Sequence, residues 1–260
     1  MRRVGWLAWS LTALVALALT APLLVVIAAS FNPTNELLVP PRGFSLVWYA
    51  NIFRRQAFLA SFRFSAALAL ASTACSLVMG LLCAVVLVRH RFRGRQLLAT
   101  ALMSPLIVPQ VVLGMSLLIF LSTIGLVSSV VGLALLHVML TVPYTTRVLT
   151  AALTRFPESL EDAAVIHGAP RPLAFLLVTL PSIKPGVVAG AIFAFVTSFD
   201  NFTASQFLVW DRTTLPVEIY SYIRTENDPT VAAISALLVL GTVGIVVLVE
   251  RWVGLETLTG

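Results

Sequence analysis

One loop of the sequence, residues 156–181, reads FPESLEDAAVIHGAPRPLAFLLVTLP and lies between two apolar runs of membrane length. Pro157 suits the first position of a helix, and the carboxylates that follow it favour the helix dipole. Gly168 suits the left-handed cap that ends such a helix, and Pro170 and Pro172 open a second short helix. The loop therefore predicts a helix–turn–helix pair parallel to the membrane. From these residues alone, it either docks on a partner or packs on its own helical bundle.

The rest of the chain is almost wholly apolar. Of its 260 residues, 59% are hydrophobic and 11% are charged, whereas soluble domains carry about 25% charged residues. A chain with so few charges cannot cover its surface in water, which places it among membrane proteins. A spanning helix takes about 20 apolar residues, so the chain has room for roughly six spans.

The apolar runs predict an all-α membrane protein with six transmembrane helices in a single domain over residues 1–260. The predicted spans cover about residues 6–29, 64–88, 97–121, 126–142, 186–208 and 231–249. The first run is longer than the core of a signal peptide, which is about 7–15 residues, so we interpret it as an uncleaved span. An amphipathic helix on the outer interface is predicted within the polar stretch of residues 31–62.

Arginines indicate the orientation. The short loop RHRFRGR after the second predicted span is rich in arginine, which is typical of the cytoplasmic side, and its arginines are Arg89, Arg91, Arg93 and Arg95. With six spans, both termini are then cytoplasmic. The outer stretch departs from this pattern, because it holds or adjoins Arg42, Arg54, Arg55 and Arg63. The net charge of +6 therefore reflects topology, and no basic cluster with exposed aromatic residues indicates nucleic acid binding.

The sequence predicts no metal, cofactor or nucleotide site of its own. Cys75 and Cys83 lie in one apolar run. Eight helical residues separate them by about 12 Å, whereas a disulfide needs Cα atoms within about 7 Å, so we interpret both as packing residues. Two cysteines provide no metal-ligand spacing, and no glycine-rich loop is typical of a phosphate cradle.

The loop also carries a motif. Asp162-Ala163-Ala164 is followed after three residues by Gly168, and after nine more by Val178, one residue and Leu180-Pro181. This spacing resembles the EAA loop of ABC importer permeases, although Asp162 stands where that family usually has Glu and Val178 where it has Ile. The segments WYANIF and SFDNFTASQFL look like the second permease subunit of spermidine/putrescine-type importers.

The resemblance implies a type I ABC importer permease fold with a cytoplasmic coupling helix between the fourth and fifth spans. It implies a transport subunit rather than an enzyme, in the bacterial cytoplasmic (inner) membrane, paired with a sister permease as a heterodimer. Its other partners would be two ATPases that hold ATP and magnesium, and an extracytoplasmic solute-binding protein. The solute would be a polyamine or a similar small cation. The ATPase-coupling residues would be Glu161, Asp162, Ala163, Ala164 and Gly168.

Candidate residues of the solute path lie in the third and fifth predicted spans. Asp200 and Asn201 fall inside the fifth, where a carboxylate costs about 2.5–3.5 kcal/mol on insertion scales. Asp200 therefore either lines the path and attracts a cation, or pairs with an arginine or caps a helix break. Gln110 follows Pro109 in the third span, and a span interrupted by proline favours an interior position.

Two other classes of membrane protein remain as alternatives. An intramembrane serine protease could use Ser116 and His137 as a dyad, but no Gly-x-Ser-x-Gly elbow surrounds Ser116, and His137 is better interpreted as an interhelical hydrogen-bonding residue. A secondary transporter or channel would need coupling or selectivity groups inside its spans. Asp200 alone offers little support for that class, and the loop at residues 156–181 would then have no role.

Overall fold

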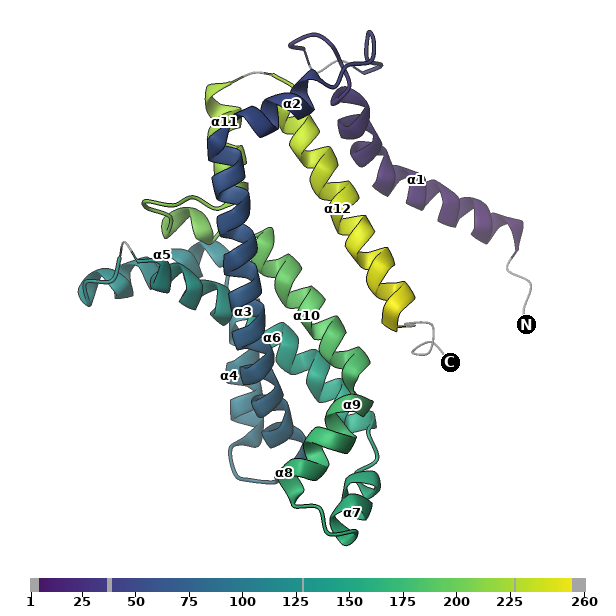
Figure 1. Cartoon of the computed structure of the whole chain (residues 1–260), viewed down its shortest axis with the longest axis vertical. Helices are drawn as coiled ribbons and strands as arrows, with labels where there is room; N and C mark the ends of the chain where they lie inside the picture. The colour runs from purple at the N-terminus through teal and green to yellow at the C-terminus, as the bar shows by residue number, and fades with distance from the viewer. Residues whose placement is uncertain (1–4, 37–38, 128, 227, 254–260) are drawn as a thin grey trace. The chain divides into compact units, whose positions relative to one another are not determined.

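The computed structural model describes residues 5–36, 39–127, 129–226 and 228–253, which are helical or irregular with no β-strand among them. The helices, shown in Figure 1, are α1 (Trp6–Ala29), α2 (Val47–Arg54), α3 (Gln56–Arg89), α4 (Arg95–Ile107), α5 (Gln110–Thr123), α6 (Val130–Arg155), α7 (Ser159–Ile166), α8 (Arg171–Ala174), the π-helix η1 (Phe175–Thr179), α9 (Leu180–Ser182), α10 (Lys184–Phe199), the 3₁₀-helix η2 (Ser205–Phe207), α11 (Leu215–Thr225) and α12 (Thr230–Val253).

Helix length and composition identify the membrane-spanning candidates. Among the described residues, α1, α3 and α6 are long and apolar enough to cross a bilayer, and up to five spans result if each of two bent helix pairs counts as one. In α12 the structure describes the side chains without a gap over Thr230–Ile245, and this part alone is a shorter apolar helix. The first helix has the bounds that the sequence predicts, and α12 contains the whole of the predicted run 231–249.

The predicted span over residues 97–121 is not one straight helix. It divides into α4 and α5, which meet at an angle of 103°. Val108 has φ −75° and ψ 132°, and Pro109 has φ −54° and ψ 132°. Proline disfavours the helical conformation in the residue before it, and this extended dipeptide redirects the chain. Gln110 consequently begins α5 instead of lying in the middle of a helix.

Three other predicted boundaries shift. Helix α6 starts at Val130, and Ser129 caps it by accepting a hydrogen bond from the Gly132 amide at 3.1 Å. The helix continues through Pro143 to Arg155, whereas the predicted span ends at residue 142. Helix α3 begins at Gln56 and absorbs part of the predicted interfacial helix, of which α2 remains separate. Helix α10 ends at Phe199, so residues 200–208 of the fifth predicted span lie outside it.

The described residues group into two compact units, one from residues 1–59 and 219–260 and one from residues 60–218. The sequence predicts a single domain over these residues. In the second unit α10 packs along α6. One apolar cluster there joins α3, α5, α6 and the segment after α10 through Leu68, Leu113, Leu121, Leu133, Leu136, Leu140, Ala204 and Leu208.

Small and hydroxyl-bearing residues bring α3 and α6 into close contact. A Cβ atom at Gly80 would lie 2.3 Å from Thr145 Oγ1 and 2.9 Å from the Thr146 amide nitrogen. Thr145 Oγ1 donates to the Ser76 carbonyl oxygen at 2.8 Å, and the Ser76 and Thr141 hydroxyls also bond to each other. Small side chains allow helices to approach closely in lipid, where hydrophobic driving force between helices is absent.

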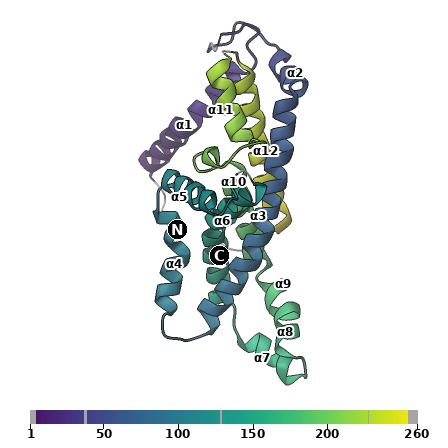
Figure 2. The same cartoon turned by 90° about the vertical axis from the view of Figure 1, so that its left-hand side faces the viewer.

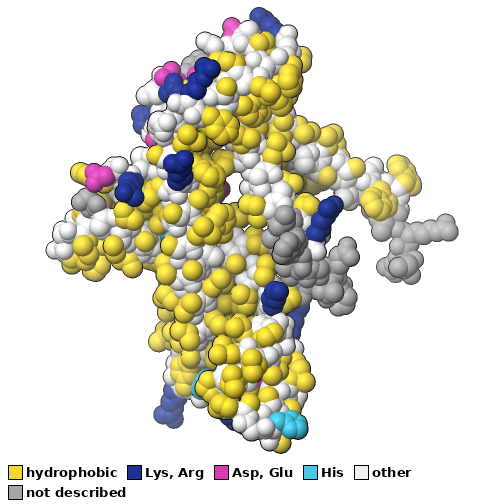
Figure 3. Space-filling view, viewed as in Figure 1, with side chains coloured by type: hydrophobic (Ala, Val, Ile, Leu, Met, Phe, Trp, Pro, Cys, Tyr) yellow, Lys and Arg dark blue, Asp and Glu magenta, His cyan; other side chains and the backbone are white. Residues whose placement is uncertain are grey.

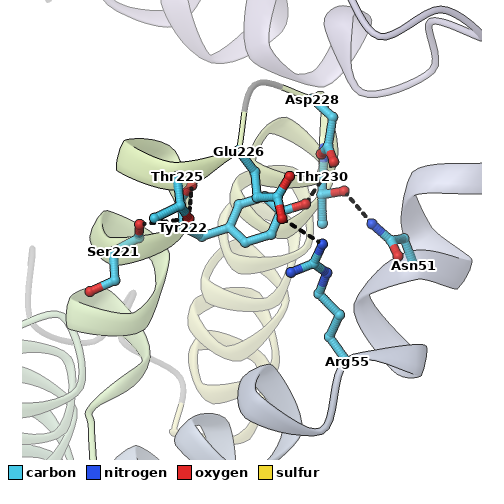
Figure 4. Close-up of polar contacts among 8 residues, drawn as sticks. All are labelled: Asn51, Arg55, Ser221, Tyr222, Thr225, Glu226, Asp228 and Thr230. Carbon is cyan, nitrogen blue, oxygen red and sulfur yellow. Dashed lines mark hydrogen bonds and ion pairs between the residues drawn. The ribbon is translucent and has the colours of Figure 1, made fainter.

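The first unit is joined by a polar cluster around Tyr222, which Figure 4 shows. Arg55 lies 3.2 Å from Glu226 and places its guanidinium 4.5 Å from the centre of the Tyr222 ring. Tyr222 donates to Asp228 at 2.7 Å, and Asp228 accepts the Thr230 amide hydrogen at 2.8 Å at the start of α12. Through these contacts Arg55, which lies between α2 and α3, is connected to α11 and α12. Arg55 is one of the arginines of the outer stretch that depart from the charge pattern, and its ion pair gives it a structural role.

The surface is as apolar as the composition predicts. Figure 3 shows hydrophobic side chains spread widely over the visible face, with few charged ones among them. In α1, large apolar side chains such as Trp9, Leu14 and Leu19 are more than 60% exposed. Such a surface is typical of a protein that meets lipid or partner subunits. The two cysteines are free, Cys83 is half-buried, and Cys75 is exposed rather than buried as predicted.

Candidate functional site

The loop that follows α6 forms α7, α8 and η1 at one end of the second unit, as Figures 1 and 2 show. Glu158 precedes α7, and both Glu161 and Asp162 lie in its first turn, where carboxylates interact favourably with the helix dipole. Pro170 precedes α8 with an extended ψ of 145°. The second short helix therefore begins where the sequence predicts.

Gly168 ends α7 in the left-handed conformation that the sequence predicts, with φ of +95°. The Gly168 amide donates to the Val165 carbonyl oxygen at 2.9 Å, and the Ala169 amide donates to the Ala164 carbonyl oxygen at 3.1 Å. This pair of bonds is the Schellman arrangement, which satisfies the last carbonyl groups of a helix. A Cβ atom at position 168 would meet nothing within 4 Å, so the requirement for glycine is one of backbone conformation rather than space.

Helix α7 presents different residues to its two sides. Asp162, Ala163 and Gly168 are exposed, and Ala164 is half-buried. Leu160 and Ile166 are large apolar residues on the same short helix with exposed fractions of 51% and 83%. A short helix with small residues and exposed apolar side chains is suited to contact with another protein.

Glu161 instead points into the molecule. Its carboxylate lies 2.7 Å from the Arg89 guanidinium at the end of α3, and Thr179 of η1 donates a hydrogen bond to it. Burial alone would raise the pKa of the Glu161 carboxyl, but the hydrogen bonds from Arg89 and Thr179 and the charges of Arg89 and Arg171 outweigh burial and lower that pKa. The lowered pKa means that this carboxylate stabilises the fold at neutral pH, and that its contribution is lost as the pH falls through the folded-state pKa.

The second candidate site is a buried polar network at the end of α10. His137 of α6 places Nδ1 2.7 Å from Ser198 Oγ and Nε2 3.0 Å from Ser205 Oγ. Ser205 Oγ and the Ser205 amide both donate to Asn201 Oδ1, at 2.9 and 3.1 Å. Asn201 Nδ2 in turn donates to Gln110 Oε1 at 3.1 Å. The network therefore connects α6, α10, η2 and the first residue of α5.

These bonds determine the protonation pattern of the imidazole. Since Ser205 Oγ gives its only hydrogen to Asn201, it accepts a hydrogen from His137 Nε2. A tautomer with its hydrogen on Nε2 fits these bonds, and in that tautomer Nδ1 of His137 accepts from Ser198 Oγ. His137 is thus the interhelical hydrogen-bonding residue that the sequence predicts. Both of its nitrogens are occupied by residues other than Ser116, which is exposed, so these two residues form no dyad.

We expect His137→Leu to destabilise the protein. The substitution leaves Ser198 Oγ without its acceptor and removes a donor to Ser205, and each buried polar group left unpaired costs about 1–3 kcal/mol. The thermal unfolding temperature of the detergent-purified protein should fall by several degrees. His167→Leu is the matched control, because His167 is exposed; equal melting of the two variants would contradict the prediction.

The three predicted path residues have different surroundings. Asn201 is buried and Gln110 is exposed, and the two side chains are hydrogen-bonded to each other. Asp200 directly follows α10 and is exposed, and its carboxylate makes no hydrogen bond or ion pair with the described residues. The structure therefore does not pair Asp200 with an arginine within the described part of this chain.

Sequence reasoning missed the roles of Arg89, Thr179 and Ser205, and it did not identify His137 as the partner of Ser198. Arg89 looks like one of several arginines that mark a cytoplasmic loop, and nothing in the sequence separates it from Arg91. The two serines are common small residues of membrane helices, and only their proximity to His137 distinguishes them. Among the described residues, no group of three or more His, Cys, Asp or Glu side chains is placed to bind a metal ion.

Comparison with known proteins identifies the family. Residues 76–253 match the model of the binding-protein-dependent transport system inner membrane component. The putrescine transport system permease protein PotI of Escherichia coli (strain K12) is 32% identical over 236 residues, which cover 88% of this chain and 83% of PotI. The spermidine/putrescine transport system permease protein PotC of Haemophilus influenzae is 29% identical over 228 residues, 87% of this chain and 88% of PotC.

A solved structure shows the same fold. The solved structure is the crystal structure of a bacterial ABC transporter involved in the import of the acidic polysaccharide alginate. One of its chains superposes on this chain with a TM-score of 0.71 and 14% sequence identity, and the match covers 96% of this chain and 95% of that chain. The family match extends over most of the chain and includes both α7 and the polar network. The chain therefore belongs to the inner membrane components of binding-protein-dependent transport systems.

Proposed function

We propose that this chain, a permease subunit of an ABC importer, forms half of the path for a small cationic organic solute of the polyamine type. Its relatives include permeases of putrescine and of spermidine/putrescine transport systems. The solute class is supported by these relatives, and the observation that supports ATP-driven transport is α7, which exposes Asp162 and Ala163 and ends at a left-handed Gly168 within the spacing of the EAA loop.

Helix α7 is proposed to be the coupling helix that docks on a partner ATPase. The exposed apolar side chains of Leu160 and Ile166 would be covered by that partner, and the small side chains of Ala163 and Ala164 would let the helix approach it closely. Asp162 stands at the first motif position and adds a charge to the same contact. Glu161 acts from the opposite side of α7, through its contacts within this chain.

Asp200 is proposed to line the solute path and to attract the cation. Its carboxylate is exposed and without a partner among the described residues, although a charge at membrane depth requires compensation. A protonated amine of the solute would supply that compensation during transport. Asn201 follows Asp200 in the sequence, and its side chain is already bonded to that of Gln110, so these two amides shape the path more than they hold charge.

The proposed topology has six spans and both termini in the cytoplasm. The spans are α1, α3, the bent pair α4 and α5, α6, α10 with the short helices before it, and α12. The arginines of the loop after α3 and the loop that contains α7 then lie on the cytoplasmic side. The partners are a sister permease, two ATPases that bind ATP and magnesium, and an extracytoplasmic solute-binding protein.

Purification and reconstitution test this function. The chain with a C-terminal tag is purified in detergent with the proteins that accompany it, and the complex is placed in liposomes with the solute-binding protein. We expect an ATPase in the complex and uptake of radiolabelled putrescine or spermidine that requires ATP. A neutral amide of similar length serves as the control solute.

The alternative functions predict other outcomes. Uptake that is driven by an ion gradient without ATP, together with the absence of an ATPase from the complex, would indicate a secondary transporter. ATP-driven uptake of the neutral control in preference to the polyamines would leave the importer function in place and overturn the proposed solute class.

A further inference from the structure

The last residue of α3 contacts two parts of the proposed coupling loop, the start of α7 and the π-helix η1. Arg89 lies 2.7 Å from the Glu161 carboxylate and 3.6 Å from the Glu158 carboxylate. It also donates to Thr179 Oγ1 at 3.5 Å, and its guanidinium lies 5.7 Å from the centre of the Phe175 ring. One side chain thus contacts the start of α7 and two residues of η1.

The Arg89–Glu161 pair is well shielded from water. Their side chains are 15% and 9% exposed, whereas the side chain of Glu158 is 64% exposed. Glu161 also accepts a hydrogen bond from Thr179. Ion pairs in which both charges are shielded and hydrogen-bonded hold their geometry more firmly than exposed pairs, because water competes less for either charge.

The contact joins α7 to a long helix that is distant from it in the sequence. Arg89 ends α3, a helix of 34 residues, and α3 is in tight contact with α6 at Gly80 and Thr145. Helix α7 itself has only eight residues and also contacts α8 and η1. Rigid helices that are joined by specific side-chain contacts are the physical means by which displacement at one site reaches another.

We infer that Arg89 and Glu161 are positioning residues that transmit the movement of α7 to α3. The inference rests on the proposed docking of α7 on an ATPase. It assigns a separate role to the buried side of α7, where Glu161 lies. The exposed side of α7 would bind the ATPase, and Glu161 on the buried side would displace α3 through its ion pair with Arg89. Loss of the ion pair should therefore separate ATP hydrolysis from transport without releasing the ATPase.

The test uses Arg89→Gln, Glu161→Gln and the double variant in the complete reconstituted complex. Three quantities are measured: the amount of co-purified ATPase, the rate of ATP hydrolysis, and the number of solute molecules taken up per ATP. We expect each single variant to retain the ATPase and to hydrolyse ATP at a rate within about threefold of wild type. Uptake per ATP should fall about tenfold in each.

The double variant distinguishes transmission from general damage. If both residues act through one bond, removing the second has no further effect, and Arg89→Gln/Glu161→Gln should resemble either single variant. It also leaves no unpaired buried charge, so it remains informative if a single variant folds poorly. Arg91→Gln is the matched control, because Arg91 is an exposed arginine two residues away and should not change uptake per ATP.

Three results would overturn the inference. Uptake per ATP within twofold of wild type in both single variants would show that the pair transmits nothing. Loss of the ATPase would make the pair part of the docking contact. Effects that multiply in the double variant would mean independent roles. Absence of an ATPase from the wild-type complex would instead contradict the proposed function itself, so the two failures are distinguishable.

Discussion

Substitution of Ala163 and Ala164 together by Asp is expected to abolish co-purification of the ATPase and, with it, ATP-driven uptake. Ala163 is exposed and Ala164 is half-buried in α7. The two substitutions add bulk and two carboxylates beside Asp162, on a face that the ATPase would cover. A carboxylate buried in an interface without a partner costs several kcal/mol, and the double substitution places two of them on a helix of only eight residues.

The measurement is the amount of ATPase that remains bound to the tagged chain through detergent purification. Gln96→Asp serves as the control, because it adds a carboxylate at another exposed position on the side that is proposed to be cytoplasmic. Equal thermal unfolding of the double variant and the wild type would show that the fold is intact. Retention of the ATPase at the wild-type amount would contradict the assignment of α7 as the coupling helix.

The second large effect is expected at Asp200. Asp200→Asn preserves the size of the side chain and removes its charge, so uptake of a dicationic solute should fall about tenfold or more, which corresponds to at least about 1.4 kcal/mol. Two unit charges 4 Å apart attract each other by about 1 kcal/mol in bulk water, and the attraction increases where water is excluded. ATPase binding should not change, because Asp200 lies at the end of α10 and α7 is formed by other residues.

Initial uptake rates over a range of solute concentrations provide the measurement. Asp211→Asn is the control, since Asp211 is another exposed carboxylate of the segment between α10 and α11. If Asp200→Asn transports polyamines as the wild type does, then Asp200 does not attract the solute, and a role in the contact with the sister permease becomes the better explanation.

Local features of this chain could be predicted from the sequence because they depend on neighbouring residues. Gly168 ends α7 with a positive φ, and the first helix ends at Ala29, as predicted. Each of these features is set by a few adjacent residues: the glycine that tolerates the left-handed conformation, and the length of an apolar run.

The features that the sequence did not predict depend on contacts between distant residues or on the direction of the chain. The apolar run over residues 97–121 has the right length for one span, but the extended Val108–Pro109 dipeptide bends it by 103°. The bond between Arg89 and Glu161 and the bonds of His137 to Ser198 and Ser205 join residues far apart in sequence. A single sequence contains no signal that selects these partners from other residues of the same kind.

The position of Arg89 also has a consequence for biosynthesis. Arg89 precedes its partner Thr179 by 90 residues, an interval of about 5 to 18 s at translation rates of about 5–20 residues per second. While α3 enters the bilayer, the guanidinium therefore has no partner in η1 and serves, with Arg91, as one of the charges that retain the loop on the cytoplasmic side in the proposed topology. Only after the later helices are made does the same charge become a structural contact. A substitution at Arg89 would thus remove one of four arginines of this loop during membrane insertion and, once η1 has formed, the contact with Thr179.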